Sequence, residues 1–295
     1  VFRENLGVLY GGGGSGGLIL VTSQNVLVAD NTATGNWGCL FQPDRSNVSG
    51  GGFSLHNVTA VTVTGNTLTA HADGADDGIY VSSEVDYGCT GLIGNNTITG
   101  VEEYGVYVDG VDDGSELRIN DNRITMRDPG NTTDQYGVYL NDYADYGSLL
   151  EINRNWITGV GNTAQDGYGI YLEGSTDGSH AFVNDNMCTE TGSGTGYGIY
   201  TNYSADSGSS MEINRNTTST YSNTGLYIND DTDEGGTLDV KNNLFYASAY
   251  GIYYNAAYEV SSGSTATFQG NEISGFSLDG FYMGGDIWGA RFNVL

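Results

Sequence analysis

Two neighbouring carboxylates give the chain its first candidate for catalysis. Asp76 and Asp77 follow one another in the segment D-G-A-D-D-G-I-Y. Paired carboxyl groups supply the general acid and the base or nucleophile in glycoside hydrolysis. The three histidines, His56, His71 and His180, are isolated from one another and from any catalytic motif. Hydrolysis of a polysaccharide is therefore one function to test, with Asp76 and Asp77 as its candidate residues.

Acidic segments that recur along the chain are candidates for cation binding. One reads D-G-V-D-D-G-S-E, and similar segments span residues 141–147, 173–178 and 229–236. Calcium prefers carboxylate and carbonyl oxygens, and stacked acidic segments repel one another unless a cation or the solvent screens them. We expect Asp109, Asp112 and Asp113 to be ligands of Ca²⁺, and the alternative is an ordinary solvated turn. No segment has the ligand spacing of an EF-hand.

A series of tyrosines is the third candidate, because each belongs to one copy of a Gly-apolar-Tyr-apolar tetrad. In a strand the two apolar residues share one face and the tyrosine takes the other. Outward-facing tyrosines in a row stabilise neighbouring strands, and they also offer a surface to sugar rings or to another copy of the protein. We expect a contact or glycan-binding strip formed by Tyr80, Tyr107, Tyr139, Tyr171, Tyr200, Tyr227, Tyr253 and Tyr282.

These candidates depend on the elements that carry them, and those elements follow from the repeat. Successive well-formed tetrads begin 26 to 32 residues apart, at Gly78, Gly105, Gly137, Gly169, Gly198, Gly225, Gly251 and Gly280. Degenerate copies begin at Gly7 and Gly38. A repeat of this length predicts an array of stacked structural units.

A second signature follows each tetrad, and it reads L-R-I-N-D-N-R-I-T over Leu117–Thr125. Its second asparagine lies 17 or 18 residues after the tetrad glycine in six copies, whereas the distance to the next glycine varies from 7 to 15. We expect this asparagine to stand at a bend in the left-handed conformation and to bond to its equivalents in neighbouring units. The expected ladder consists of Asn31, Asn66, Asn96, Asn122, Asn155, Asn186, Asn216, Asn243 and Asn271.

The two signatures predict three short strands per unit, and no segment has the apolar period of a helix. The 47 glycines and 2 prolines fit many tight turns. Units of this kind stack as a parallel β-helix, in which each strand pairs with its equivalent one coil away. We therefore predict one all-β domain over residues 1–295, with about ten coils and almost no helix.

With these motifs the chain resembles the right-handed parallel β-helix proteins of the pectate-lyase-like superfamily, and it is most similar to the repeats of carbohydrate-binding and sugar-hydrolase modules. The resemblance covers about residues 7 to 290. It implies a right-handed coil and a location outside the cell or on its surface. It does not fix an activity, because the superfamily includes lyases, hydrolases, tailspikes and adhesins. Asp76 and Asp77 resemble the paired aspartates of polygalacturonases, but the Gly-His-Gly and Arg-x-Lys motifs of those enzymes are missing.

Composition excludes two classes of partner. Asp and Glu total 36 against 9 Lys and Arg, and the net charge of −27 would repel nucleic acids and anionic membranes. The sequence contains no run of 18 apolar residues, so no membrane span is predicted. Three cysteines, Cys39, Cys89 and Cys188, are too few for a disulfide framework, and Cys39 and Cys188 fall on inward positions. Sequons predict possible glycosylation sites at Asn47, Asn57, Asn131 and Asn202.

The ends of the chain bear on the expected function. The chain begins at Val1 within a repeat, which is typical of a processed or truncated protein, and no capping helix is predicted at either end. We expect an extracellular structural or adhesive protein that associates with itself, head to tail or laterally, into filaments. The alternatives are a polysaccharide-binding or polysaccharide-degrading β-helix enzyme that uses Ca²⁺ or a carboxylate pair, and a phage or surface adhesin module.

Overall fold

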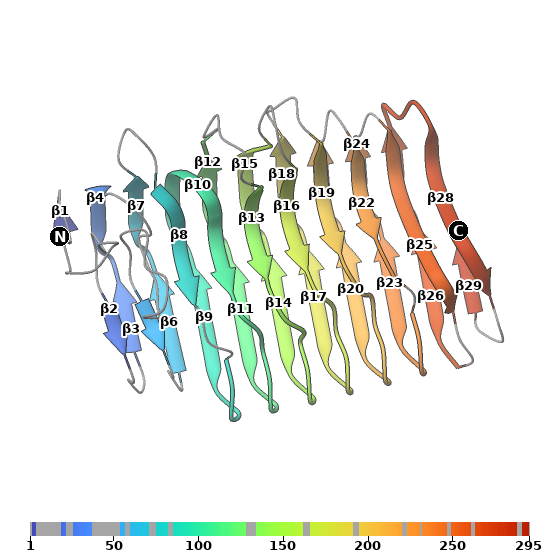
Figure 1. The fold of residues 1–295 in the computed structure, drawn as a ribbon, viewed down its shortest axis with the longest axis horizontal. Coiled ribbons are helices and arrows are strands. Elements are labelled where there is room, and N and C mark those ends of the chain that lie inside the picture. Colours follow the sequence, from blue (N-terminus) through green and yellow to red (C-terminus); the bar gives the residue numbers. More distant parts are fainter. Residues whose placement is uncertain are drawn as a thin grey trace.

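The computed structural model describes residues 2–3, 19–21, 26–36, 54–56, 60–70, 75–81, 85–127, 134–161, 166–190, 195–219, 223–230, 232–246, 249–260, 263–287 and 291–294. Within these residues every regular element is a β-strand, and every pair of strands is parallel. The strands stack along one elongated body (Figure 1). The predicted all-β parallel β-helix is confirmed.

The strands form three rows. The tetrad row contains β2 (Ile19–Val21), β5 (Ser54–His56), β8 (Ala75–Val81), β10 (Thr97–Val108), β13 (Gln135–Leu140), β16 (Gly167–Leu172), β19 (Gly196–Thr201), β22 (Thr224–Ile228), β25 (Tyr250–Val260) and β28 (Asp279–Ile287). The second row contains β3 (Val26–Ala29), β6 (Ala60–Thr64), β9 (Thr90–Gly94), β11 (Glu116–Asn120), β14 (Leu149–Asn153), β17 (His180–Asn184), β20 (Ser210–Asn214), β23 (Thr237–Lys241), β26 (Thr265–Gln269) and β29 (Arg291–Val294). The third row contains β1 (Phe2–Arg3), β4 (Thr32–Asn36), β7 (Thr67–Ala70), the beginning of β10, β12 (Arg123–Met126), β15 (Trp156–Val160), β18 (Met187–Glu190), β21 (Thr217–Ser219), β24 (Leu244–Tyr246) and β27 (Glu272–Ser274).

The number of coils follows from the rows. The second row holds ten strands, which form a sheet of their own, and the other two rows join in one sheet because the long strand β10 belongs to both. The best-described part is the seven turns from β8 to β27, each with one strand in every row. Of the roughly ten coils predicted, about seven run from β8 to β27, and the strands β1 to β7 and β28 to β29 extend the same rows at the two ends.

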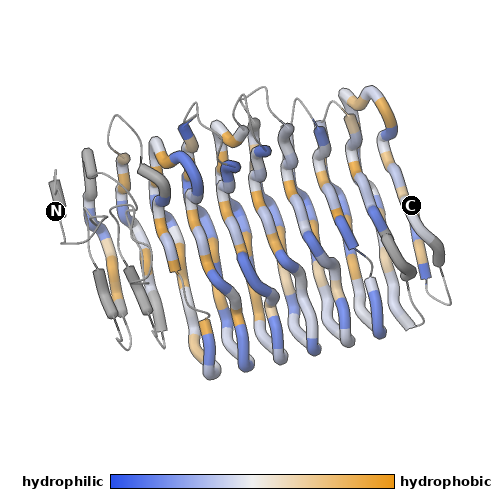
Figure 2. Tube along the Cα trace, viewed as in Figure 1, coloured by the Kyte–Doolittle hydropathy of each residue, from blue (hydrophilic) through white to orange (hydrophobic). Residues whose placement is uncertain are grey.

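The repeat keeps equivalent residues in register from coil to coil. In the pair β16–β19, Ile170 lies beside Ile199 and Tyr171 beside Tyr200. Ile170 is 0% exposed, whereas Tyr171 lies on the outer face and is half-buried. The predicted alternation of the tetrad is thus confirmed, and apolar and polar segments recur at the same level in successive coils (Figure 2). Burial of the inward aliphatic column is the main stabilising contribution to the solenoid.

The tetrad glycine is required by close packing between two rows. A Cβ atom on Gly137 would lie 2.3 Å from Cγ2 of Ile157 in the third row and 2.5 Å from the carbonyl oxygen of Gly169. Only a residue without a side chain lets the third row approach the tetrad row this closely.

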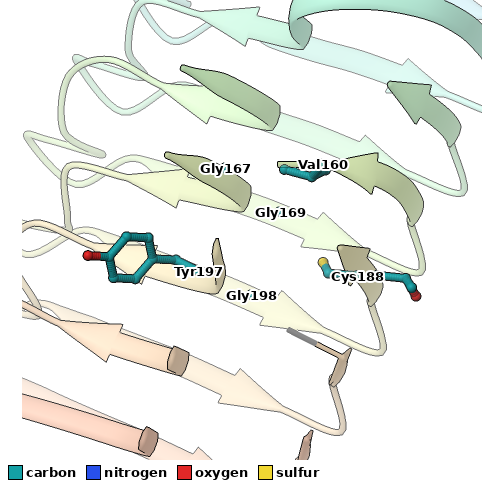
Figure 3. Close-up of a pocket in the computed structure, with 7 residues that line it drawn as sticks. Val160, Gly167, Gly169, Cys188, Tyr197 and Gly198 are labelled. Atoms are coloured by element: carbon teal, nitrogen blue, oxygen red, sulfur yellow. The ribbon is translucent and has the colours of Figure 1, made fainter. Parts of the chain in front are cut away.

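In the third row, Cys188 occupies the position that Ile157 has in the preceding coil. The smaller side chain leaves a cavity of about 10 Å³ lined by Val160, Gly169 and Tyr197, among others (Figure 3). This volume holds no more than one water molecule. Burial raises the pKa of the Cys188 thiol to about 12, so the thiol stays neutral and behaves as a small apolar group.

Candidate functional site

The predicted asparagine ladder is formed by a repeated set of hydrogen bonds at the bend between the second and third rows. Asn122 donates through its backbone N and its Nδ2 to Oδ1 of Asn155, each at 3.0 Å. Asn155 does the same to Asn186, and its Nδ2 also donates to the carbonyl oxygen of Ile119 at 2.7 Å. The chain of Nδ2–Oδ1 bonds runs from Asn31 to Asn271 with lengths of 2.9 to 3.1 Å.

The expected backbone conformation of the ladder asparagines is wrong. The left-handed residue is the one before each asparagine, with φ of 59° at Asp121, 56° at Arg154 and 59° at Asp185. This preceding residue turns the chain, and the asparagine then points its amide into the bend. The exposed turning position tolerates Asp, Arg, Asn and Gly, because its side chain lies in solvent.

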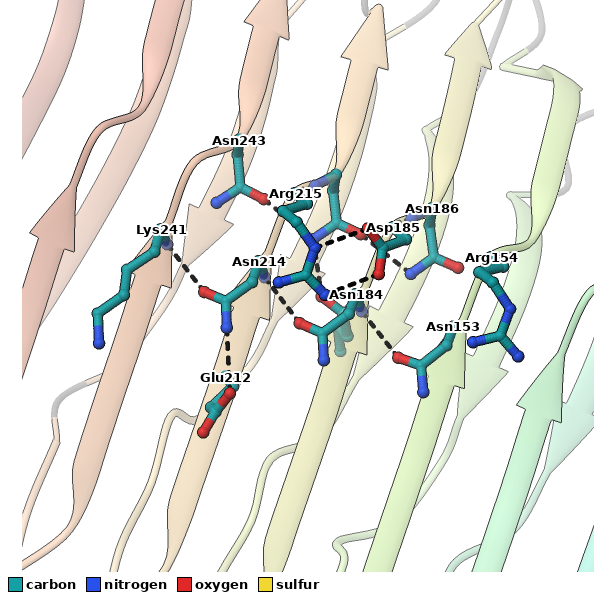
Figure 4. Close-up of polar contacts among 12 residues, drawn as sticks. Asn153, Arg154, Asn184, Asp185, Asn186, Glu212, Asn214, Arg215, Lys241 and Asn243 are labelled. Atoms are coloured by element: carbon teal, nitrogen blue, oxygen red, sulfur yellow. Dashed lines mark hydrogen bonds and ion pairs between the residues drawn. The ribbon is translucent and has the colours of Figure 1, made fainter.

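A second asparagine ladder, which the sequence reasoning missed, lies two residues before the first. The backbone N of Asn153 donates to Oδ1 of Asn120 at 2.9 Å, and Asn184 and Asn214 continue the series up to the backbone N of Lys241 (Figure 4). Its bonds point toward the preceding coil, opposite to those of the first ladder. The sequence signal was the first asparagine of the repeated N-x-N.

Buried serines form a third ladder at the bend between the tetrad row and the second row. The backbone N of Ser115 donates to Oγ of Ser148 at 3.2 Å, and Ser148 donates to Ser179 at 2.9 Å and Ser179 to Ser209 at 3.2 Å in the same way. Each serine lies seven residues before a ladder asparagine, so its constant spacing was the signal that could have found it. These three ladders are structural devices and explain most of the repeated polar residues.

Charged residues alternate along the left-handed positions. Arg154 forms two hydrogen bonds of 2.8 Å with Asp121, and Arg215 pairs in the same way with Asp185. Hydrogen bonding to the arginine lowers the pKa of each of these carboxyls. All four side chains are more than one third exposed, so each pair contributes little to stability.

The tyrosine strip is a continuous stack of rings. Successive rings of the predicted column lie 4.1 to 5.4 Å apart between centroids, from Tyr80 to Tyr282. A second column, missed in the sequence, contains Tyr104, Tyr136, Tyr168 and Tyr197, with spacings of 4.8 to 5.2 Å. Its rings meet those of the first column edge to face, as in the pair Tyr168–Tyr171 at 85°.

The stacking of the tyrosine rings determines which ligands the strip can bind. The faces of neighbouring rings cover one another, for example at 1° between Tyr200 and Tyr227, so the strip presents edges and hydroxyl groups rather than open ring faces. A sugar that stacks on an aromatic face would find this surface closed. Burial raises the pKa of most of these hydroxyl groups and keeps them protonated.

Asp109, one of the predicted calcium ligands, belongs to the edge of this strip. It accepts hydrogen bonds from the Tyr107 hydroxyl at 3.1 Å and from Nδ2 of Asn141 at 2.9 Å. The sequon residue Asn202 occupies the same edge, where its Nδ2 donates to Glu173 at 2.7 Å and its Oδ1 accepts from Asn229 at 3.0 Å.

Asp112 and Asp113 instead lie with Asp86 of the preceding coil. Carboxylate oxygens of these three residues lie within 4.8 Å of one another, and no other such group of three occurs among the described residues. Burial raises the pKa of Asp86, and the nearby charges of Asp113 and Asp112 raise it further, against the hydrogen bond from Tyr87. The structure thus brings together two of the three predicted residues and replaces Asp109 by Asp86.

The predicted catalytic pair lies in β8. Asp77 is buried on the outer face beside Tyr104, at the position that tyrosines occupy in later coils. Adjacent residues of a strand point to opposite faces, so β8 does not favour a convergent pair. The Asp76 side chain, Asn47, Asn57, Asn131 and Cys39 lie outside the described residues.

The remaining surface feature is a groove across four coils on the side of the acidic turns. It has a volume of about 450 Å³ and is lined by Tyr143, Asp145, Ser175, Thr176, Tyr203, Asp206, Asp230 and Asp233. Each of Asp145, Asp206 and Asp233 begins a tight turn and accepts a hydrogen bond from the next residue. Burial raises the pKa of Asp145, and the charges of Asp177, Asp112 and Asp142 add to this effect.

Two aromatic side chains line the groove. The rings of Tyr143 and Tyr203 lie 5.4 Å apart at 45°, although they come from coils on either side of the one that contains Gly174. A Cβ atom on Gly174 would lie 2.9 Å from Cβ of Tyr203, so a larger residue at this position would press against the next coil. Tyr203 is 40% exposed. The groove therefore joins an accessible aromatic pair to a row of carboxylates and hydroxyls.

The described residues contain no helix that could span a membrane.

Comparison with known proteins bears on the fold. Residues 44–187 match the family model described as "Right handed beta helix region". No curated protein matches the chain, and no solved structure matches it. The matched segment is thus similar to right-handed β-helix regions, and the strands from β19 to β29 continue the same stack.

Proposed function

We propose that the protein is a noncatalytic β-helix that acts outside the cell as an adhesive rod and binds an extended polysaccharide. The groove between Tyr143 and Asp233 carries this proposal. It runs over four adjacent coils whose spacing is fixed by hydrogen-bond ladders, so its binding groups are held in place before a ligand arrives. Aromatic side chains with a few polar groups are the usual lining of a ligand site.

The groove aspartates support binding rather than catalysis. Asp112, Asp145 and Asp233 occupy the same turn position in their coils, and each uses one carboxylate oxygen to hold the backbone of its own turn. A residue repeated for the same local purpose in successive coils is explained by the turn.

The test combines a binding assay with a cleavage assay. Purified protein is incubated with insoluble and soluble polysaccharides, and bound protein and new reducing or unsaturated ends are measured. We expect binding to at least one polysaccharide without product formation, and a loss of binding in Tyr203→Ala. Release of sugar products would contradict the noncatalytic function, and an absence of binding to every polysaccharide would contradict the adhesive one.

Self-association is a second candidate, and exposed apolar side chains on the last described coil favour it. Phe276 is 46% exposed and Leu278 is 59% exposed, next to strand β28, which pairs only with β25 among the described strands. A second copy of the chain that adds a coil at this end would cover both side chains. Light scattering and electron microscopy of the protein and of a Phe276→Ser, Leu278→Ser variant test this. We expect oligomers or filaments of the unchanged protein and monomers of the variant, and monomers of both would contradict it.

A further inference from the structure

The charge of the groove limits the ligands that it can hold. Four of its eight lining residues, Asp145, Asp206, Asp230 and Asp233, carry carboxylates, and no lining residue is a cation. The whole chain adds a net charge of −27. An acidic polysaccharide would meet like charge along the entire groove, so its binding is unfavourable. A ligand with positive charges would be attracted at every carboxylate.

The carboxylates are spread along the axis and do not surround one point. Asp145, Thr176, Asp206 and Asp233 occupy the same position in four successive coils, as the backbone bonds of their turns show. Asp145 and Asp206 are therefore about 9.6 Å apart along the axis, at about 4.8 Å per coil. No three of the groove carboxylates bring oxygens within 4.8 Å of one another. The row fits a chain with several separate cations better than one metal ion.

Thr176 and Gly174 belong to the coil that lies between those of Asp145 and Asp206, and they interrupt the repeated pattern of the turns. Thr176 replaces the aspartate of neighbouring coils, and Gly174 has no side chain beside Cβ of Tyr203. The groove thus contains aromatic groups, and its charged groups alternate with a hydroxyl. A sugar chain has the matching features: apolar ring faces, hydroxyl groups, and substituents repeated at the length of a sugar unit.

The floor of the groove contains a polar atom without a partner. Ser175 is 1% exposed, and its Oγ has no hydrogen-bond partner among the described residues. The equivalent residues of neighbouring coils are Val111, Ala144 and Ala205, all apolar. A buried unpaired hydroxyl is costly, and it calls for an explanation at this position. Ser175 thus lies beneath the groove, in register with residues of the core.

We propose that this groove binds a cationic amino-sugar polymer, with amines on Asp145 and Asp206 and a sugar ring against Tyr203. The inference deepens the proposed polysaccharide binding and rests on it. A lysine-rich peptide would satisfy the carboxylates as well. The sugar is favoured because Tyr143, Thr176 and Tyr203 offer hydroxyls that donate and accept, as sugar hydroxyls require.

The test is calorimetry of the full chain with a glucosamine hexamer at low and high salt. An N-acetylglucosamine hexamer is the neutral control, and a lysine hexamer is the peptide control. We expect the glucosamine hexamer to bind at least tenfold more tightly than either control, and salt to weaken it. Asp145→Asn and Asp206→Asn are expected to weaken binding at least fivefold each, and Tyr203→Ala to weaken it as well.

Asp112→Asn is the matched control variant, because it removes the same charge from the same turn position outside the groove. Equal losses in Asp112→Asn and Asp145→Asn would overturn the groove as the site and leave only attraction to an acidic surface. Equal binding of the acetylated hexamer would overturn the cationic class. Tighter binding of the lysine hexamer would assign the groove to basic peptides. If a neutral polysaccharide binds and glucosamine does not, this inference fails and the adhesive function stands; if no glycan binds, both fail.

Discussion

At the scale of single residues, the ladder asparagine is the least replaceable side chain of the repeat. Asn155 accepts from two nitrogen atoms of Asn122 and donates to Ile119 and Asn186, and it is 1% exposed. An aspartate could not donate, and a glutamine would place its amide one carbon farther away. The side chain therefore satisfies two backbone groups of the preceding coil and joins the asparagine amides of the coils on either side.

Replacing this asparagine by alanine should be costly. Asn155→Ala leaves the Asn122 nitrogens and the Ile119 carbonyl without partners, so we expect the free energy of unfolding to fall by about 2–4 kcal/mol. Urea denaturation followed by circular dichroism measures the change. Asn141→Ala, which removes an exposed amide, is the control and should stay within about 0.5 kcal/mol of the unchanged protein. A loss at Asn155 no larger than at Asn141 would contradict this role.

The ladder residues could be predicted from their spacing, but their conformation could not. Asparagine tolerates positive φ well, so propensity pointed to Asn122 and Asn155 as the turning residues. The hydrogen bonds to neighbouring coils require the asparagine amide to lie inside the bend. The left-handed conformation is therefore adopted by the preceding residues, Asp121 and Arg154. The interactions that override propensity join residues about 30 positions apart, which local sequence reasoning does not see.

At the scale of the element, the tetrad row combines an aliphatic inner face with a tyrosine outer face. The outer face buries phenol groups against one another, and burial raises the pKa of Tyr197 to about 12 and that of Tyr104, Tyr107 and Tyr168 further. The strip therefore favours the protonated form of its hydroxyl groups in the folded state.

This shift predicts a loss of stability in alkali. Tyrosines of the unfolded chain ionise near pH 10, so above that pH the unfolded state binds fewer protons than the folded one and stability falls as pH rises. Urea midpoints between pH 8 and about pH 11 measure the effect, and the phenolate absorbance should rise in one late step on unfolding. Tyr171→Phe should reduce the pH dependence, whereas Tyr87→Phe, at a 79% exposed site, should not. Ionisation of all 22 tyrosines near pH 10 in a stable protein would contradict it.

The second tyrosine column shows why strand limits matter for prediction. The tetrad was read as beginning at glycine, but strands such as β13 begin earlier, at Gln135, and include the tyrosine before the glycine. Tyr104, Tyr136, Tyr168 and Tyr197 all precede a tetrad glycine, so the pattern was present in the sequence. Their edge-to-face contacts with the first column arise from coil stacking, which fixes the ring orientation.

At the scale of the whole molecule, charge is the dominant surface property. A net charge of −27 on one rod, with carboxylates repeated in the turns of successive coils, creates repulsion that the surrounding ions reduce. The ion pairs of Arg154 and Arg215 offset this only locally.

Salt should therefore stabilise the folded protein at neutral pH. We expect the melting temperature at pH 7 to rise with sodium chloride, because screening weakens the repulsion between carboxylates more in the compact rod than in the unfolded chain. Near the isoelectric point of about 4.1 the same salt series should have little effect. Differential scanning calorimetry measures both series. A melting temperature at pH 7 that is independent of salt, or falls with it, would contradict this prediction.

The groove shows the limit of prediction at this scale. The acidic turns were found in the sequence, but the spacing alone placed the candidate cation site at Asp109, Asp112 and Asp113. Tyr143 and Tyr203 are 60 positions apart, and they come from coils on either side of the coil that contains Gly174. A contact between residues two coils apart leaves no local pattern in the sequence.

The segment between the third row and the tetrad row varies in length from coil to coil. The stretch from the ladder asparagine to the next tetrad glycine has 8 residues after Asn243 and 15 after Asn122, whereas the pairing on both sides keeps its register. The length of this segment thus varies without a change in the register of the strands on either side. The rod is therefore suited to carry grafted peptides, such as epitopes, in a regular array at this segment of successive coils.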